Sequence, residues 1–161
     1  MARALVISGF PGVGKTTLER YERIVEDYER IVDLESSGFH WFETPGEFVP
    51  TVRHLHPEWP RNYVNKIDEL SQDYMKIILI STHAEVRELL LKQRIPYIIV
   101  CPTLDCKNEY MIRYLRRGSD AEFIAKMDQS FRESLVSLEN DPAPKIYLAR
   151  GQYLQDVLPP L

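Results

Sequence analysis

Residues 4–16 of the chain read ALVISGFPGVGKT, and this stretch decides the fold. The run at residues 4–8 is short and apolar, which is typical of a strand buried on both faces. It leads into a complete G-x-x-x-x-G-K-[ST] pattern from Gly9 to Thr16. Glycines in such a loop let backbone amides approach a phosphate closely, and the next helix points its N-terminus at the anion. The pattern therefore predicts a phosphate-binding loop between a strand and a helix.

Individual residues of this loop have distinct expected roles. Lys15 should reach the β- and γ-phosphates of a nucleotide, and the Thr16 hydroxyl should bind Mg²⁺. The alternative is a glycine-rich turn that matches by chance, but the strand before it and the amphipathic helix after it favour phosphate binding. We expect contacts with the nucleotide from Gly9, Phe10, Pro11, Gly12, Val13, Gly14, Lys15, Thr16 and Thr17.

The rest of the chain alternates between strand and helix patterns. Further apolar runs predict strands at residues 30–34, 76–80, 97–100 and 145–148. Helical patterns occupy residues 15–28, 61–71, 83–94, 107–117, 120–139 and 152–157. This alternation predicts one α/β domain over residues 1–161, with a mostly parallel five-stranded sheet and helices on both faces in three layers.

One long segment interrupts the alternation. Residues 35–61 contain two glycines and four prolines, too many for a long helix or a central strand. A loop of this length is usually functional or disordered, and its many aromatic residues argue against disorder. Trp41 and Tyr63, with their aromatic neighbours, could stack on a base or form a small core under the loop. We expect residues 35–72 to be an insertion that binds an acceptor molecule.

Composition excludes several classes of protein. The net charge of −4 and the pI of about 5.6 disfavour nonspecific nucleic-acid binding, which usually needs a basic domain. The chain has two cysteines, Cys101 and Cys106, which make neither a disulfide framework nor a paired zinc motif. No apolar stretch approaches the roughly 20 residues that cross a bilayer. We therefore expect a cytoplasmic protein with no membrane partner.

The chain resembles small P-loop kinases of the nucleoside and nucleotide kinase group. It is more closely similar to compact kinase-like proteins common in bacteriophage genomes, over nearly its whole length. Beyond the loop, the resemblance is carried by DLESSGFHW at 33–41, PEWPRNY at 57–63 and STHAEVR at 81–87. It implies ATP and Mg²⁺ as cofactors, the host cytoplasm as location, and the sheet order 2-3-1-4-5 when the five predicted strands are counted along the chain.

Asp33 and Glu35 follow the second predicted strand, whose carboxyl end faces the ligand crevice of an open α/β sheet. In the kinases that the chain resembles, an acidic residue there accepts the acceptor's proton or holds Mg²⁺ through water, which implies this role for Asp33. A helix cap or surface acid pair is the alternative. The third strand ends in Ser81 and not in aspartate, and no NKxD motif occurs, which disfavours ATPases and GTPases.

Residues 103–120 resemble the lid of small kinases, whose arginines close on the transferred phosphoryl group. Arg113 and Arg117 are four residues apart and so share a helical face, which favours them over Arg116 as catalytic residues. A solvated basic helix face is the alternative interpretation.

These features predict a kinase that moves the γ-phosphoryl group of Mg·ATP to a nucleotide or nucleoside. Two alternatives stay open: a kinase acting on a DNA hydroxyl, and a nucleotide-binding regulatory protein without transfer activity. Candidate acceptor-binding residues follow the second and third strands or lie in the insertion: Glu35, Ser36, Trp41, Tyr63, His83 and Arg87. The acceptor and the oligomeric state are not fixed by the sequence.

Overall fold

The computed structural model describes residues 2–26 and 30–158. Its main sheet has five strands in the order β2-β5-β1-β6-β7, and every neighbouring pair is parallel. The five strands lie at the five predicted apolar runs, which confirms the α/β class and the parallel sheet. Their bounds are β1 Leu5–Gly9, β2 Ile31–Asp33, β5 Ile77–Ile80, β6 Ile98–Pro102 and β7 Lys145–Leu148.

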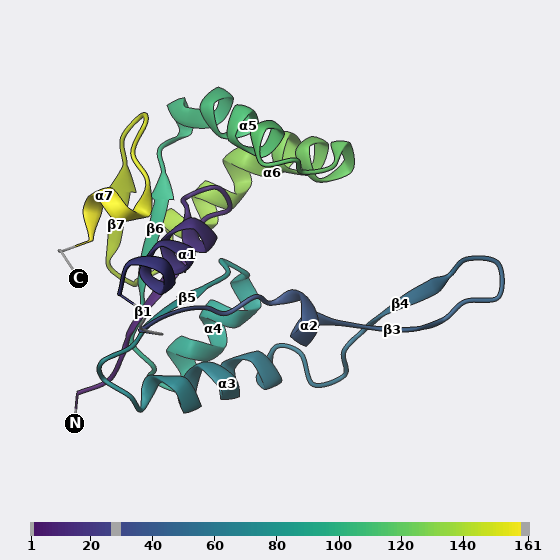
Figure 1. The fold of residues 1–161 in the computed structure, drawn as a ribbon, viewed down its shortest axis with the longest axis horizontal. Coiled ribbons are helices and arrows are strands. Elements are labelled where there is room, and N and C mark those ends of the chain that lie inside the picture. The colour runs from purple at the N-terminus through teal and green to yellow at the C-terminus, as the bar shows by residue number, and fades with distance from the viewer. Residues whose placement is uncertain (1, 27–29, 159–161) are drawn as a thin grey trace.

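Numbered along the whole chain, this order differs from the predicted 2-3-1-4-5 because the insertion adds two strands. The sequence indicated an irregular loop there, and that prediction was wrong. A short helix α2 (Ser37–His40) leads into β3 (Trp41–Pro45), which pairs antiparallel with β4 (Thr51–Leu55) in a separate two-stranded sheet. This hairpin projects away from the main sheet, to the right in Figure 1.

The direction of each crossover decides which face of the sheet a helix covers. The step from β1 to β2 runs one way along the sheet, and the steps from β2 to β5, β5 to β6 and β6 to β7 run the other way. Right-handed crossovers therefore place α1 on one face and α3, α4 and α6 on the other. The helices are α1 Lys15–Glu26, α3 Arg61–Ser71, α4 Ala84–Lys92, α5 Lys107–Arg116, α6 Ala121–Glu139 and α7 Leu154–Val157.

The observed helices agree with the predicted ones to within a few residues, although the predicted end of the first, at Tyr28, lies outside the described residues. Asp120 caps α6 by accepting a 2.7 Å hydrogen bond from the Phe123 amide. In the described part of the chain, no helix is long and apolar enough to cross a membrane. Because all five strands of the main sheet run in parallel, their carboxyl ends meet at one edge, where the loop after β1 lies.

Candidate functional site

The loop between β1 and α1 has its carbonyl oxygens bonded to the protein. The Tyr114 hydroxyl donates to the Pro11 carbonyl at 2.7 Å, Arg113 Nη1 donates to the Gly12 carbonyl at 2.8 Å, and the Leu154 amide donates to the Val13 carbonyl at 2.8 Å. These donors belong to α5 and α7, which come much later in the chain than the loop. Because these carbonyl oxygens already accept hydrogen bonds from elsewhere, they do not compete with an anion for the space that the loop encloses. The loop is therefore organised to receive an anion.

Two loop glycines leave little room for a side chain. Gly12 and Gly14 have φ values of 95° and 100°, in the left-handed region that favours glycine. A Cβ at Gly12 would lie 3.0 Å from the Tyr114 ring, and one at Gly14 would lie 3.1 Å from the Tyr153 ring. The tyrosines therefore pack directly on the loop. This role could not be predicted from the sequence, because an aromatic residue in a helix or beside one is usually part of the core.

Lys15 lies at the start of α1 and donates a hydrogen bond from its ammonium to the Gly9 carbonyl. Burial lowers its pKa to about 8, although the Asp33 and Glu35 carboxylates raise it; Arg117 lowers it further. The carboxylates of Asp33 and Glu35 thus attract the ammonium, and the Arg117 guanidinium repels it. A cation on this loop is placed to neutralise phosphate charge.

Thr16 and Asp33 meet as the sequence predicts for a metal site. The Thr16 hydroxyl donates a 2.8 Å hydrogen bond to Asp33 Oδ2, and the Asp33 amide donates a 2.5 Å hydrogen bond to Glu19 Oε2. No cluster of three or more histidine, cysteine, aspartate or glutamate side chains that could hold a metal occurs in residues 2–26 and 30–158. Mg²⁺ needs only one or two protein oxygens when it also binds phosphates, so this hydroxyl and carboxylate fit it.

A cavity of about 740 Å³ opens over the loop. Both basic and acidic side chains line it, a combination suited to a polyanion with its metal. Asp33, the catalytic acid predicted from the sequence, lines it together with Glu35 and with three arginines at the end of α5. Its lining includes Lys15, Thr16, Thr17, Asp33, Glu35, Ser36, His83, Arg113, Arg116 and Arg117.

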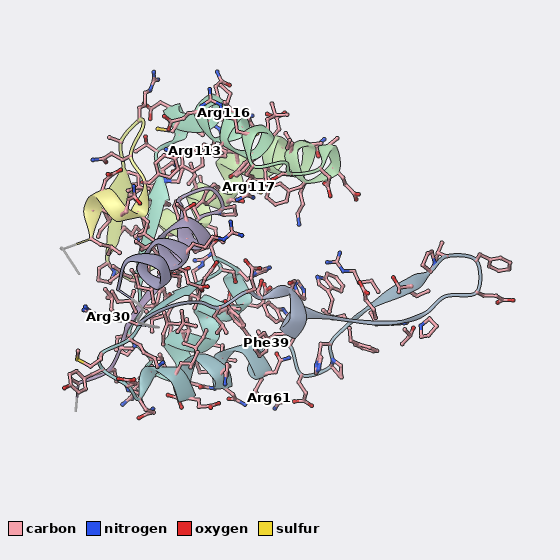
Figure 2. The ribbon with its side chains drawn as sticks, in the orientation of Figure 1. Arg30, Phe39, Arg61, Arg113, Arg116 and Arg117 are labelled. Carbon is pink, nitrogen blue, oxygen red and sulfur yellow. The ribbon has the colours of Figure 1, made fainter. Side chains whose placement is uncertain are left out.

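The three arginines at the end of α5, which Figure 2 labels, have different environments. Arg113 is only 8% exposed; its guanidinium lies 4.4 Å from the Tyr110 ring centre and 3.9 Å from that of Tyr153. It donates to the Gly12 carbonyl and, at 2.7 Å, to the Gln152 carbonyl. Arg113 therefore holds the loop and the turn before α7 together, which differs from the predicted lid contact with a transferred phosphoryl group.

Arg117 and Arg116 are exposed and line the cavity. Arg117 lies over the Tyr114 and Phe123 rings, at 4.9 and 5.2 Å, and its Nε donates to the Ser119 hydroxyl at 2.8 Å. These contacts hold its guanidinium at the cavity wall. The predicted closure of residues 103–120 stays a prediction.

Tyr63 is fully buried and joins the ends of two strands. Its hydroxyl donates to the Leu34 carbonyl at 2.5 Å and accepts from the Ser81 amide at 3.2 Å. Burial raises the pKa of this phenol. Tyr63 therefore fixes the distance between the segments that carry Asp33 and Ser81. The sequence suggested that its ring could stack on an acceptor base, but the ring is buried and not open to one.

The other aromatic residues of the insertion also cover one another. The His40 ring stacks between Trp41 and Trp59, with ring centres 4.3 and 4.2 Å apart, and Arg53 lies 4.9 Å above Trp41. His83 meets this stack edge-on, 5.2 Å from His40. The small core under the insertion that the sequence suggested is present, and it occupies ring faces of Trp41 and Trp59.

His83 and Arg87 flank the end of β5 in different ways. His83 lines the cavity, and its Nδ1 lies 2.7 Å from the Ser81 hydroxyl; burial lowers its pKa. Arg87 is only 5% exposed and forms a 2.8 Å ion pair with Asp141. It also donates to the Ser137 hydroxyl at 2.8 Å. Arg87 thus joins α4 to the end of α6 and lines a cavity between these helices, apart from the one over the loop, and its contact with an acceptor stays a prediction.

A further cavity of about 490 Å³ lies between α5 and the turn before α7. Asp105 and Asn108 line one side, Arg150 and Gly151 line the other, and Arg113 and Tyr153 separate it from the loop. The Gly151 amide donates a 2.6 Å hydrogen bond to Glu109. This cavity is near enough to the loop for the base of a nucleotide to reach it while the loop binds the phosphates of that nucleotide.

Comparisons with known proteins add little to this picture. No protein-family model matches the chain, and no curated protein matches it. Among solved structures, a gluconokinase from Sinorhizobium meliloti 1021 is similar over 96% of this chain and 86% of that chain, with 14% sequence identity and a TM-score of 0.49. We draw no argument from a likeness at this level. The loop after β1 lies between a buried parallel strand and a helix, which is the structural setting expected of a phosphate-binding loop.

Proposed function

We propose that the chain is a Mg·ATP-dependent phosphotransferase that moves the γ-phosphoryl group to a small acceptor. The observation that carries this proposal is the Thr16–Asp33 hydrogen bond beside Lys15 in one cavity. It places an oxygen pair for Mg²⁺, a cation for phosphate and an acidic side chain within one site. A nucleoside or nucleotide is the acceptor that the family resemblance suggests.

The residues act mainly by positioning and charge neutralisation. The loop amides and Lys15 hold the donor, and Thr16 and Asp33 would hold Mg²⁺, which neutralises phosphate charge when bound. The acceptor oxygen forms a bond to the γ-phosphorus while the bond from that phosphorus to the β,γ-bridging oxygen breaks and ADP leaves. The acceptor's proton passes to Asp33 and then to solvent. Arg117, held at the cavity wall, balances charge on the transferred group.

Product analysis with γ-labelled ATP tests this proposal. The panel contains nucleosides, nucleoside monophosphates, sugars and sugar alcohols, and single-stranded DNA, each with Mg²⁺ or with EDTA. We expect Mg²⁺-dependent transfer of label to an organic acceptor, and no transfer by Lys15→Ala. Label released only as inorganic phosphate, or binding of ATP without any turnover, would favour an ATPase or a regulatory nucleotide-binding protein instead.

A further inference from the structure

A third cavity, of about 460 Å³, runs from the loop down between α4 and α6. We call it the α4–α6 groove. It shares five lining residues with the larger cavity: Pro11, Lys15, Ser81, His83 and Phe123. The two spaces therefore meet at the Lys15 side chain. The volume of the groove is within the roughly 300–1,000 Å³ of small-molecule sites.

The position of the groove suits an acceptor. In-line transfer needs the attacking oxygen on the side of the γ-phosphorus opposite the leaving ADP. The cavity that Asp105 and Arg150 line lies on one side of the loop, beyond Arg113 and Tyr153. The groove opens from Lys15 along Thr82 and α6. It is separate from the other cavity, because its lining does not include Arg113, Arg150 or Tyr153. A donor whose base lies between α5 and α7 would thus direct its γ-phosphate toward the groove.

The lining of the groove is rich in hydroxyl groups. Two of its serines are engaged, Ser81 with His83 and Ser137 with Arg87. Thr82, Ser130 and Ser134 bring three more hydroxyls to the lining. Ser130 donates to the Lys126 carbonyl at 2.7 Å, which leaves its oxygen able to accept another hydrogen bond.

Apolar and charged groups complete the groove. Phe123 and Met127 supply apolar surface, while Lys126 and Glu133 are exposed charges on the same face of α6. A lining that alternates hydroxyl groups with apolar patches matches a molecule that carries hydroxyl groups on a carbon skeleton. Hydrogen bonds would then fix its orientation, as in other small-molecule sites.

The groove itself offers little to a flat base, because its Phe10 ring is buried and Trp41, Trp59 and Tyr63 do not line it. Phe123 is the aromatic ring that both cavities share, and it packs edge-on against Tyr114 with Arg117 5.2 Å away. A base held mainly by stacking needs an open aromatic face.

From this we infer that the α4–α6 groove binds the acceptor, and that the acceptor is a sugar or sugar alcohol whose hydroxyl receives the phosphoryl group. The inference rests on the proposed phosphotransferase function and narrows its acceptor. Asp33 lines the larger cavity, which meets the groove at Lys15, so the reacting hydroxyl must lie where the two spaces join. There the acceptor oxygen bonds to the γ-phosphorus, ADP leaves, and the hydroxyl proton passes to Asp33, so the reaction needs no further reactant.

The test compares two tryptophan variants of α6. Ser130→Trp fills the groove, whereas Gln129→Trp puts the same side chain on a neighbouring exposed position that does not line it. Thr82→Val with Ser130→Ala removes two hydroxyls with little change in volume. Each protein is assayed for transfer of label from ATP to pentoses, hexoses, their alcohols, nucleosides, nucleoside monophosphates and single-stranded DNA. The rise in melting temperature with Mg·ATP is measured alongside.

We expect label on a sugar or sugar alcohol, and a KM for that acceptor raised at least about tenfold in Ser130→Trp and in the double variant, since lost pocket contacts commonly cost this much. Gln129→Trp should match the wild type, and all the proteins should keep the ATP-induced rise. Transfer only to nucleosides, nucleotides or DNA, no transfer to any sugar, or an unchanged KM in both groove variants overturns the inference. If Mg·ATP does not raise the melting temperature of the wild type, the proposed function itself is overturned.

Discussion

Arg113 Nη1 donates a 2.8 Å hydrogen bond to the carbonyl oxygen of Gly12, 101 residues earlier in the chain. The same guanidinium donates to the Gln152 carbonyl and lies between the rings of Tyr110 and Tyr153. One side chain thus joins the phosphate-binding loop, α5 and the turn before α7. The arrangement makes Arg113 a positioning residue for the donor.

Arg113→Ala should therefore lower both stability and ATP affinity. Hydrogen bonds to a charged group are worth about 1.5–3 kcal/mol, and the two carbonyls would lose their donor. We expect an unfolding free energy lower by about 2–3 kcal/mol, measured by urea denaturation, and a weaker ATP-induced shift. Arg116→Ala, an exposed change on the same helix, should leave the denaturation midpoint in place. If Arg113→Ala instead lowers kcat alone, with normal stability and ATP affinity, the lid role predicted from the sequence is correct.

Asp33→Asn should separate binding from chemistry. The amide keeps the size of the side chain, can still accept the Thr16 hydrogen bond and still offers an oxygen to Mg²⁺ beside the phosphates, so the Mg·ATP-induced rise in melting temperature should largely remain. It cannot take the acceptor's proton, and positioned acid–base groups usually contribute about 100-fold or more. We expect kcat to fall by at least that factor in a steady-state assay. Near-normal turnover would assign the role to Glu35, the next acidic residue lining the cavity.

Arg117→Ala should act on the transition state. Its guanidinium is held at the cavity wall by Ser119, Tyr114 and Phe123, and its charge reaches Lys15. Removal of one such preorganised group typically costs about 100-fold or more in kcat. kcat and kcat/KM should fall together, while ATP affinity changes little. Arg116→Ala should have the smaller effect; full activity in both variants would show that this face of α5 is only solvated.

Lys15 should make ATP binding depend on pH. Burial lowers its pKa to about 8, so the free protein loses this positive charge as the pH rises through 8. ATP affinity should then decline above pH 8, by at most about tenfold per pH unit, in titration calorimetry. The free energy of unfolding changes with pH in the opposite direction. Between the lowered pKa and the ordinary value of 10.5, the unfolded chain binds more protons at Lys15 than the folded chain, so the free energy of unfolding increases with pH. Lys15→Met should lose both dependences, and a variant that keeps them would exclude Lys15 as the titrating group.

The main sheet and the loop could be predicted from the sequence because their signals are local. Short apolar runs mark the buried strands, and the glycine, lysine and threonine spacing marks the loop. The β3–β4 hairpin was missed because it lies outside the core: Phe48 and Val49 at its tip are 92% and 53% exposed, so burial imposes little alternation on it. The prolines at 45 and 50 also favoured a loop.

The role of Arg113 could not be predicted for a different reason. Its partners are backbone carbonyls of Gly12 and Gln152, and a carbonyl leaves no trace in the sequence. Spacing alone put Arg113 and Arg117 on one helical face and so gave them one role. The structure separates them by depth, since Arg113 is buried against two tyrosines and Arg117 is exposed at the cavity.

The most direct test of the central claim is the change in melting temperature on adding Mg·ATP, compared between the wild type and Lys15→Ala. A ligand that binds only the folded state stabilises it by about 2.7 kcal/mol at 100 times its Kd. The account predicts a clear, Mg²⁺-dependent rise for the wild type and loss of most of it in Lys15→Ala, with the same melting temperature for the two free proteins to within a few degrees. An equal rise in both proteins, or no rise in the wild type, would contradict it.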